Sequence, residues 1–119
     1  MAWDDTCHES RPGVLISHAW GGRSDFEDNK AAQLAELGYV GFAIDLYGKG
    51  VRGSNSDENT VLMQLLLNDR PLLQQRMHIA LSQCRKQKEV DATRVAAMGF
   101  CFGGLCVLDL ARTGADVLG

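Results

Sequence analysis

Three short apolar runs, at residues 14–17, 39–44 and 95–99, stand out along the chain. Each is too short for a helix and is bounded by glycine, proline or aspartate, which is typical of buried strands. Stretches with helical apolar spacing separate them. This alternation predicts an α/β fold: a three-layer unit in which right-handed crossovers build a short parallel sheet with helices on both faces.

The first helix is predicted between Ser24 and Gly38. Ser24 and Glu27 form a capping-box pattern, and Gly38 stands where a helix commonly ends. Its apolar face is expected to consist of Ala31, Leu34, Ala35 and Leu37.

Further helices are predicted over about residues 59–67, from Asp69 onward and over residues 102–112. Asp69 is a plausible N-cap, since Pro71 is tolerated in the first turn that follows. The buried face of the helix after Asp69 should carry Leu73, Met77, Ala80, Leu81 and Cys84. Residues 91–93 are expected to form a turn that introduces the third strand.

The composition is that of an ordinary globular domain. The chain has 119 residues, of which 45% are hydrophobic and 23% charged, so residues 1–119 are expected to form one domain. Twelve Lys and Arg against fifteen Asp and Glu give 12 − 15 = −3, without a basic run for nucleic acid. The sequence shows no signal-peptide pattern and no apolar run of membrane length. A cytoplasmic location without a membrane partner is therefore expected.

The four cysteines are expected to be free thiols. Cys7, Cys84, Cys101 and Cys106 show no C-x-x-C spacing, and the histidines at 8, 18 and 78 do not cluster with them. A bound metal is therefore not expected.

Residues 99–104, Gly-Phe-Cys-Phe-Gly-Gly, carry the strongest chemical signal. They match the nucleophile elbow G-x-S-x-G with Cys101 in place of serine, between a predicted strand and a predicted helix. Gly99 and Gly103 would let the chain turn sharply enough to expose the thiol. The helix N-terminus would favour the reactive thiolate, and the Phe102 N–H would face a developing oxyanion.

Two other interpretations compete with the elbow. A cysteine at an apolar helix start is often a small buried hydrophobe, which is the expected role of Cys106. A glycine-rich strand-to-helix turn can also cradle phosphate in a nucleotide-binding domain. That fingerprint needs G-x-G-x-x-G, whereas the glycines here are residues 99, 103 and 104.

Three stretches together resemble the dienelactone hydrolase family of α/β-hydrolases: residues 12–21, residues 38–48 and residues 99–104. The resemblance implies a strand order of 39–44, 14–18, 94–100. It also implies hydrolysis of a small-molecule ester or lactone through a Cys–His–Asp triad and an acyl-enzyme, without metal or organic cofactor. Cys101 would be the nucleophile, and the N–H groups of Phe102 and Ala19 would form the oxyanion hole.

The sequence departs from the family in two respects. His18 stands where dienelactone hydrolase has a glutamate near the thiol, so His18 is a candidate partner of Cys101. The family's triad Asp and His are expected on loops beyond the elbow helix, which implies that the domain is truncated at both ends. The chain alone is therefore expected to be weak or inactive. The alternative is a non-catalytic truncated α/β module or oligomerising scaffold.

Four other residues are weaker candidates for the site. Asp45 ends a strand at the edge where α/β sites lie, but it equally suits a turn. Arg52 and Arg70 could meet a substrate carboxylate or simply lie at the surface, and Trp20 could line a pocket or pack on the sheet.

In the strand order that the resemblance implies, a further strand pairs alongside residues 94–100 and is absent here, so the third strand is expected to lie at an open edge of the sheet. Lysine or proline on an edge strand discourages pairing with another chain, and residues 95–99 contain neither. A homodimer or higher homo-oligomer is therefore expected, joined through this edge or by exchange of terminal elements.

Overall fold

The computed structural model describes residues 1–4, 9–48 and 51–117. Seven elements follow one another: β1 (Arg11–Ser17), α1 (Asp25–Glu36), β2 (Val40–Ala43), α2 (Ser56–Leu67), α3 (Arg70–Arg85), β3 (Val90–Gly99) and α4 (Phe102–Arg112). Cys7 and His8 lie outside the described residues, so the predictions for them stay open. Among the described helices, none is both long enough and apolar enough to cross a membrane.

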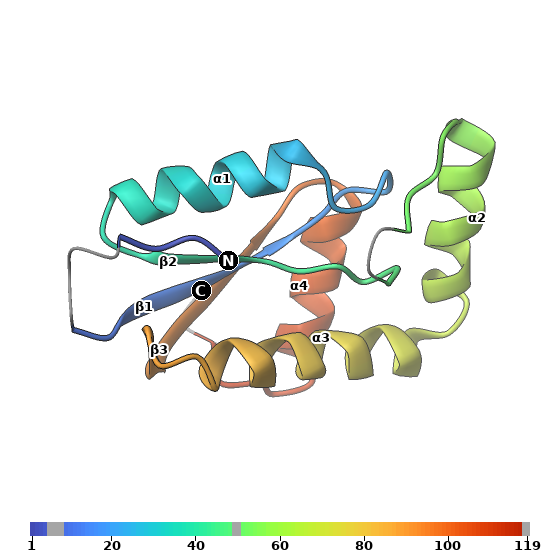
Figure 1. Ribbon diagram of the computed structural model, residues 1–119. Coiled ribbons are helices and arrows are strands. Elements are labelled where there is room, and N and C mark those ends of the chain that lie inside the picture. Colours follow the sequence, from blue (N-terminus) through green and yellow to red (C-terminus); the bar gives the residue numbers. More distant parts are fainter. Residues whose placement is uncertain (5–8, 49–50, 118–119) are drawn as a thin grey trace.

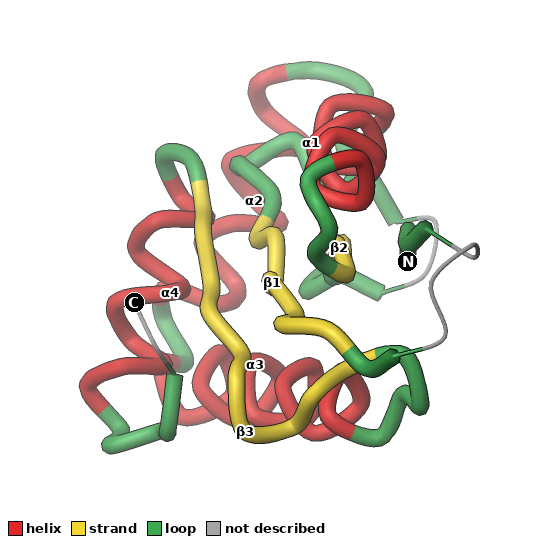
Figure 2. The backbone as a smooth tube through the Cα atoms, turned by 90° about the vertical axis from the view of Figure 1, so that its left-hand side faces the viewer, coloured by secondary structure: helices red, strands yellow, loops and turns green. Residues whose placement is uncertain are grey.

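The three strands form a parallel sheet in the order β2-β1-β3, which confirms the predicted fold class and strand order. Figure 2 shows β1 between its two neighbours. In Figure 1, α1 covers one face of the sheet, while α3 and α4 lie against the other. The chain moves from β1 to β2 past one face and returns to β3 past the opposite face, as right-handed crossovers require.

Capping explains where the helices begin and end. Ser24 and Glu27 form the expected capping box at the start of α1. At its end Gly38 has a φ of 92°, and the N–H groups of Gly38 and Tyr39 bond to the carbonyls of Ala35 and Leu34, as in a Schellman motif. Asp69 caps α3 as predicted, through its carboxylate and the Leu72 N–H.

Several predicted boundaries were too narrow. Asn55 caps α2, which therefore begins at Ser56 rather than near residue 59. The expected turn at residues 91–93 lies within β3, where the register shifts from Asp91 opposite Pro12 to Val95 opposite Gly13. The Asp91 carboxylate accepts the Thr93 N–H at 3.0 Å, so the turn exists as a bulge in the strand.

One residue of the predicted apolar face of α1 is not buried. Leu37, expected on that face, is 73% exposed.

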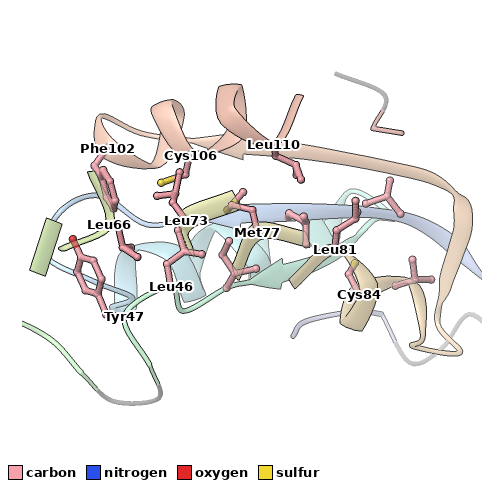
Figure 3. Close-up of a cluster of buried hydrophobic side chains, with 14 of the residues drawn as sticks. Leu46, Tyr47, Leu66, Leu73, Met77, Leu81, Cys84, Phe102, Cys106 and Leu110 are labelled. Carbon is pink, nitrogen blue, oxygen red and sulfur yellow. The ribbon is translucent and has the colours of Figure 1, made fainter. Parts of the chain in front are cut away.

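The main core lies between the sheet and the α3–α4 pair. Figure 3 shows Phe102, Cys106 and Leu110 pointing from α4 toward side chains of α3. The predicted α3 face is confirmed for Leu73, Met77, Leu81 and Cys84, which are buried, while Ala80 is half-buried. On the opposite face a Cβ at Gly41 would come within 2.5 Å of the Ala31 Cα, so small residues let α1 approach β2 closely. The parallel register places the ends of β1 and β3 side by side, with Ser17 opposite Gly99.

Candidate active site at the carboxyl edge of the sheet

Cys101 occupies a sharp turn between β3 and α4. Its φ of 54° and ψ of −116° make it the only non-glycine residue with positive φ in the described part of the chain. Such a conformation costs about 1–3 kcal/mol and persists only where the surrounding structure enforces it. The Cys101 side chain is exposed. The turn therefore presents the thiol to solvent at the carboxyl edge of the sheet, as a nucleophile elbow does.

Gly99 and Gly103 make this turn sterically feasible. A Cβ at Gly99 would lie 2.2 Å from the carbonyl carbon of Gly103, and a Cβ at Gly103 would lie 2.2 Å from the Ser17 carbonyl oxygen. Gly104 differs, because a Cβ there would meet nothing closer than 3.5 Å. The structure thus supplies a separate steric reason for each of the two predicted elbow glycines.

The predicted oxyanion donors lie on the two chain segments that meet at this edge. Ser17 is opposite Gly99 in the parallel register, so Ala19 follows β1 where the elbow follows β3. Phe102 is the first residue of α4, and its N–H group precedes the first intrahelical hydrogen bonds. Backbone N–H groups on these two segments would suit the developing negative charge of a tetrahedral intermediate.

His18 is fully buried beneath this edge, with both ring nitrogens bonded to the backbone. Its Nε2 accepts the Leu46 N–H at 3.0 Å, and its Nδ1–H donates to the Ala19 carbonyl at 2.7 Å. Because the amide must donate and the carbonyl must accept, these bonds define the neutral Nδ1–H tautomer. Burial lowers the pKa of His18, against the hydrogen bond to Ala19 and the charges of Asp45 and Glu27. This arrangement disfavours the hypothesis that His18 takes a proton from Cys101.

Tyr47 works together with His18, although the sequence did not single it out. Its ring centroid lies 4.7 Å from that of His18, and its hydroxyl donates to the Trp20 carbonyl at 2.8 Å. Burial and the nearby Cys106 raise the pKa of Tyr47 to about 12, so the phenol remains a donor at neutral pH. His18 and Tyr47 thus hold residues 19 and 20, the segment that carries one predicted oxyanion donor. A tyrosine two residues after Asp45 was the only available signal.

A cleft of about 660 Å³ opens in front of this segment. Its walls include Ala19, Trp20, Phe26 and Arg52. Trp20 is 38% exposed, so the pocket interpretation of this residue fits better than packing on the sheet. Through Ala19 the cleft borders one predicted oxyanion donor, whereas residues 99–104 of the elbow do not line it.

The remaining candidates have structural roles in the described chain. Asp45 accepts the Tyr47 N–H at 3.2 Å, which is a turn contact. Arg70 donates to both carboxylate oxygens of Asp109, and His78 bonds to the Thr113 hydroxyl at 2.8 Å. No group of His, Cys, Asp or Glu with the geometry of a metal site occurs among the residues described.

Known proteins resemble this chain in both sequence and fold. A curated relative from Bradyrhizobium sp., described as "Probable 2-oxo-3-(5-oxofuran-2-ylidene)propanoate lactonase", is 29% identical over 106 residues, covering 87% of this chain and 42% of the relative. The solved structure of m3DLH is 38% identical, with a TM-score of 0.90, over 97% of this chain and 48% of that one.

A second solved structure is described as the dienelactone hydrolase-like promiscuous phosphotriesterase P91 from metagenomic libraries. It is 36% identical, with a TM-score of 0.89, over 97% of this chain and 48% of its own. The chain thus spans about half the length of the relatives it matches. The sequence model described as "Dienelactone hydrolase family" matches residues 4–119, and the chain belongs to that family.

Proposed function

We propose that this chain is the nucleophile-bearing part of a hydrolase that acts on ester or lactone carbonyls, with Cys101 as the nucleophile. One observation carries the proposal: an exposed cysteine held at positive φ between two glycines that cannot bear a side chain. A strained, exposed residue at a strand-to-helix turn is costly without a function. Membership of a hydrolase family supports the same reaction class.

The proposed reaction has two steps. The Cys101 thiol first loses its proton to solvent. The thiolate attacks the carbonyl carbon, and the N–H groups of Phe102 and Ala19 hold the oxyanion while a sulfur–carbon bond forms. The carbon–oxygen bond then breaks, and the leaving alkoxide takes a proton from solvent. Water next attacks the acyl-enzyme, which releases the acid and restores the thiol. His18 acts here as a positioning residue that orients the segment bearing Ala19, rather than as the base.

The resemblance implies that the family's aspartate and histidine follow the elbow helix, so residues 1–119 are not expected to include them. Without them general acid–base assistance, worth about 10²–10⁴-fold, is missing. We therefore expect the 119-residue chain to be acylated at Cys101 but to turn over slowly. The relative described as a phosphotriesterase suggests phosphotriesters as a second electrophile for the same thiol.

Acylation can be measured directly with p-nitrophenyl acetate. We expect a burst of up to one p-nitrophenol per chain and a mass increase of one acetyl group on the peptide that contains Cys101. Cys101→Ala should abolish both, and Cys106→Ala should retain both because Cys106 is fully buried. A parallel reaction with diethyl p-nitrophenyl phosphate tests the phosphotriester.

Two outcomes would contradict this proposal or its details. Acylation of another residue, or none on a folded chain, would favour the non-catalytic module instead. For His18→Asn, a slower burst with an unchanged pH profile is expected of a positioning residue. If the burst rate of the native chain depended on a group titrating near neutral pH and that dependence vanished in His18→Asn, His18 would be the base after all.

We also propose that two copies pair through the free edge of β3. Within the described residues, β3 bonds to β1 on one side only, and residues 95–99 carry no charge that would discourage pairing. The bulge at Asp91 blunts only the beginning of this edge. Light scattering coupled to size exclusion at micromolar concentration should give the mass of a dimer. A well-folded monomer would contradict the proposal.

A further inference from the structure

Two exposed phenylalanines flank the elbow on the side of α1. Phe26 comes from the first turn of α1, and Phe100 immediately precedes Cys101. Their ring centroids are 5.1 Å apart at 84°, an edge-to-face pair, yet Phe26 is 48% and Phe100 36% exposed. Aromatic groups in contact that remain open to solvent mark a surface suited to an apolar ligand.

Lys30 constrains these two rings. Its ammonium group lies 5.6 Å from the centroid of Phe26 and 6.0 Å from that of Phe100. Phe26 and Lys30 are one helical turn apart on α1, so the contact follows from the helix itself. Cation–π attraction of this kind restricts the rings before any ligand arrives, which lowers the entropy cost of binding.

The same surface continues into the cleft beside the oxyanion hole. Phe26 lines that cleft together with Ala19 and Trp20. Glu27, the acidic residue in its wall, is only 3% exposed and bonds to the backbone and hydroxyl of Ser24. Aromatic side chains therefore extend from the cleft to the residue next to the nucleophile, without an open carboxylate from Glu27 between them.

We propose that Phe26 and Phe100, held by Lys30, form a subsite for an aromatic ring in the acyl or leaving group of the substrate. The inference deepens the proposed function and rests on it, because it assumes that Cys101 is the reacting atom. Its physical basis is ring–ring packing next to the thiol, which selects aryl over small alkyl groups.

Two matched alkylating reagents test the subsite without the rest of the catalytic machinery. N-phenyl- and N-methyl-2-chloroacetamide both react by sulfur–carbon bond formation with loss of chloride. The second-order rate of Cys101 labelling is measured for each by peptide mass, and the phenyl-to-methyl ratio is divided by the ratio for glutathione. One aromatic contact predicts a corrected ratio of about 3–10. Phe26→Ala should bring it close to one, and Lys30→Met should lower it less.

Controls separate the possible failures. Leu37→Ala removes another exposed apolar residue after the far end of α1 and should leave the ratio unchanged. The rate with the methyl reagent shows whether the elbow is intact in each variant. A corrected ratio that is equal in the native chain and in Phe26→Ala overturns the subsite. Failure of either reagent to label Cys101 first overturns the proposed function instead. If Phe26→Ala changes the mass in light scattering but not the ratio, the rings belong to a chain–chain contact, and the subsite is wrong.

Discussion

Two cysteines five residues apart, one immediately before α4 and one in its middle, lie in very different surroundings. Cys101 is exposed at positive φ, whereas Cys106 is fully buried against the core. Burial raises the pKa of the Cys106 thiol to about 12, although the Ser17 hydroxyl partly opposes the shift. Burial likewise raises the pKa of Cys84 on α3 to about 11. The elbow residue is exposed and has a strained backbone, whereas the α3–α4 region is closely packed and holds the elbow in that conformation.

The largest effect is expected from a methyl group added beneath the elbow. Gly103→Ala would place its Cβ 2.2 Å from the Ser17 oxygen and 2.7 Å from the His18 oxygen, so α4 must move away from β1. We expect a loss of about 3 kcal/mol in the free energy of unfolding. The matched control is Gly104→Ala, which has room for its Cβ and should change stability by less than about 1 kcal/mol in either direction. Urea denaturation of both variants decides, and equal stabilities would refute the steric account of the elbow.

A smaller effect is expected in the α3–α4 region. The side chain of Asp109 is only 3% exposed. Its Oδ2 lies 2.7 Å from Nε of Arg70, and its Oδ1 lies 2.8 Å from Nη1 of Arg112. Asp109→Asn should cost about 2 kcal/mol, because these hydrogen bonds lose their charge while both arginines can still reach water. Asp28→Asn is the matched control, since the Arg23–Asp28 pair is well exposed and should contribute less than about 1 kcal/mol.

The same carboxyl predicts an acid-sensitive component of stability. Burial tends to raise the pKa of Asp109, but the hydrogen bonds and charges of Arg70 and Arg112 outweigh it and hold the pKa below its ordinary value. A depressed pKa in the folded state stabilises the protein above the unfolded pKa of about 3.9, and that contribution is lost as the pH falls further. Between pH 5 and pH 3 the native chain should therefore lose more stability than Asp109→Asn. If the native chain and Asp109→Asn lost the same amount of stability over this pH range, the ion-pair assignment would be contradicted.

The smallest effect concerns His18 near neutral pH. Because burial lowers its pKa in the folded chain, the unfolded chain binds the proton first as the pH falls below about 6.5. Stability should then decline by up to about 1.4 kcal/mol per pH unit between pH 6.5 and pH 5. His18→Asn should flatten this slope. An unchanged slope in His18→Asn would mean that the ring is not buried in its neutral form.

The sequence was most informative where one residue had one local consequence. The capping box at Ser24 and the cap at Asp69 were predictable from the residues, because caps act locally. The order of the strands is not local, and it was predicted only through the family resemblance. The turn at residues 91–93 was predicted, but its position as a bulge inside β3 was not, since that depends on the pairing with β1. The hydrogen bond between His18 and Leu46 was also beyond prediction, because it joins segments 28 residues apart. The Phe26–Phe100 pair likewise links α1 to the elbow only through tertiary packing.

The contrast between the exposed Cys101 and the buried Cys106 is tested most directly by limited labelling with iodoacetamide near pH 7, read by peptide mass. The account predicts that Cys101 is labelled first, and that Cys84 and Cys106 react only on unfolding because burial excludes the reagent and disfavours their thiolates. The thiol at position 7 is resolved in the same measurement. Labelling of Cys84 or Cys106 before Cys101 in the folded chain would contradict the assignment of Cys101 as the exposed nucleophile.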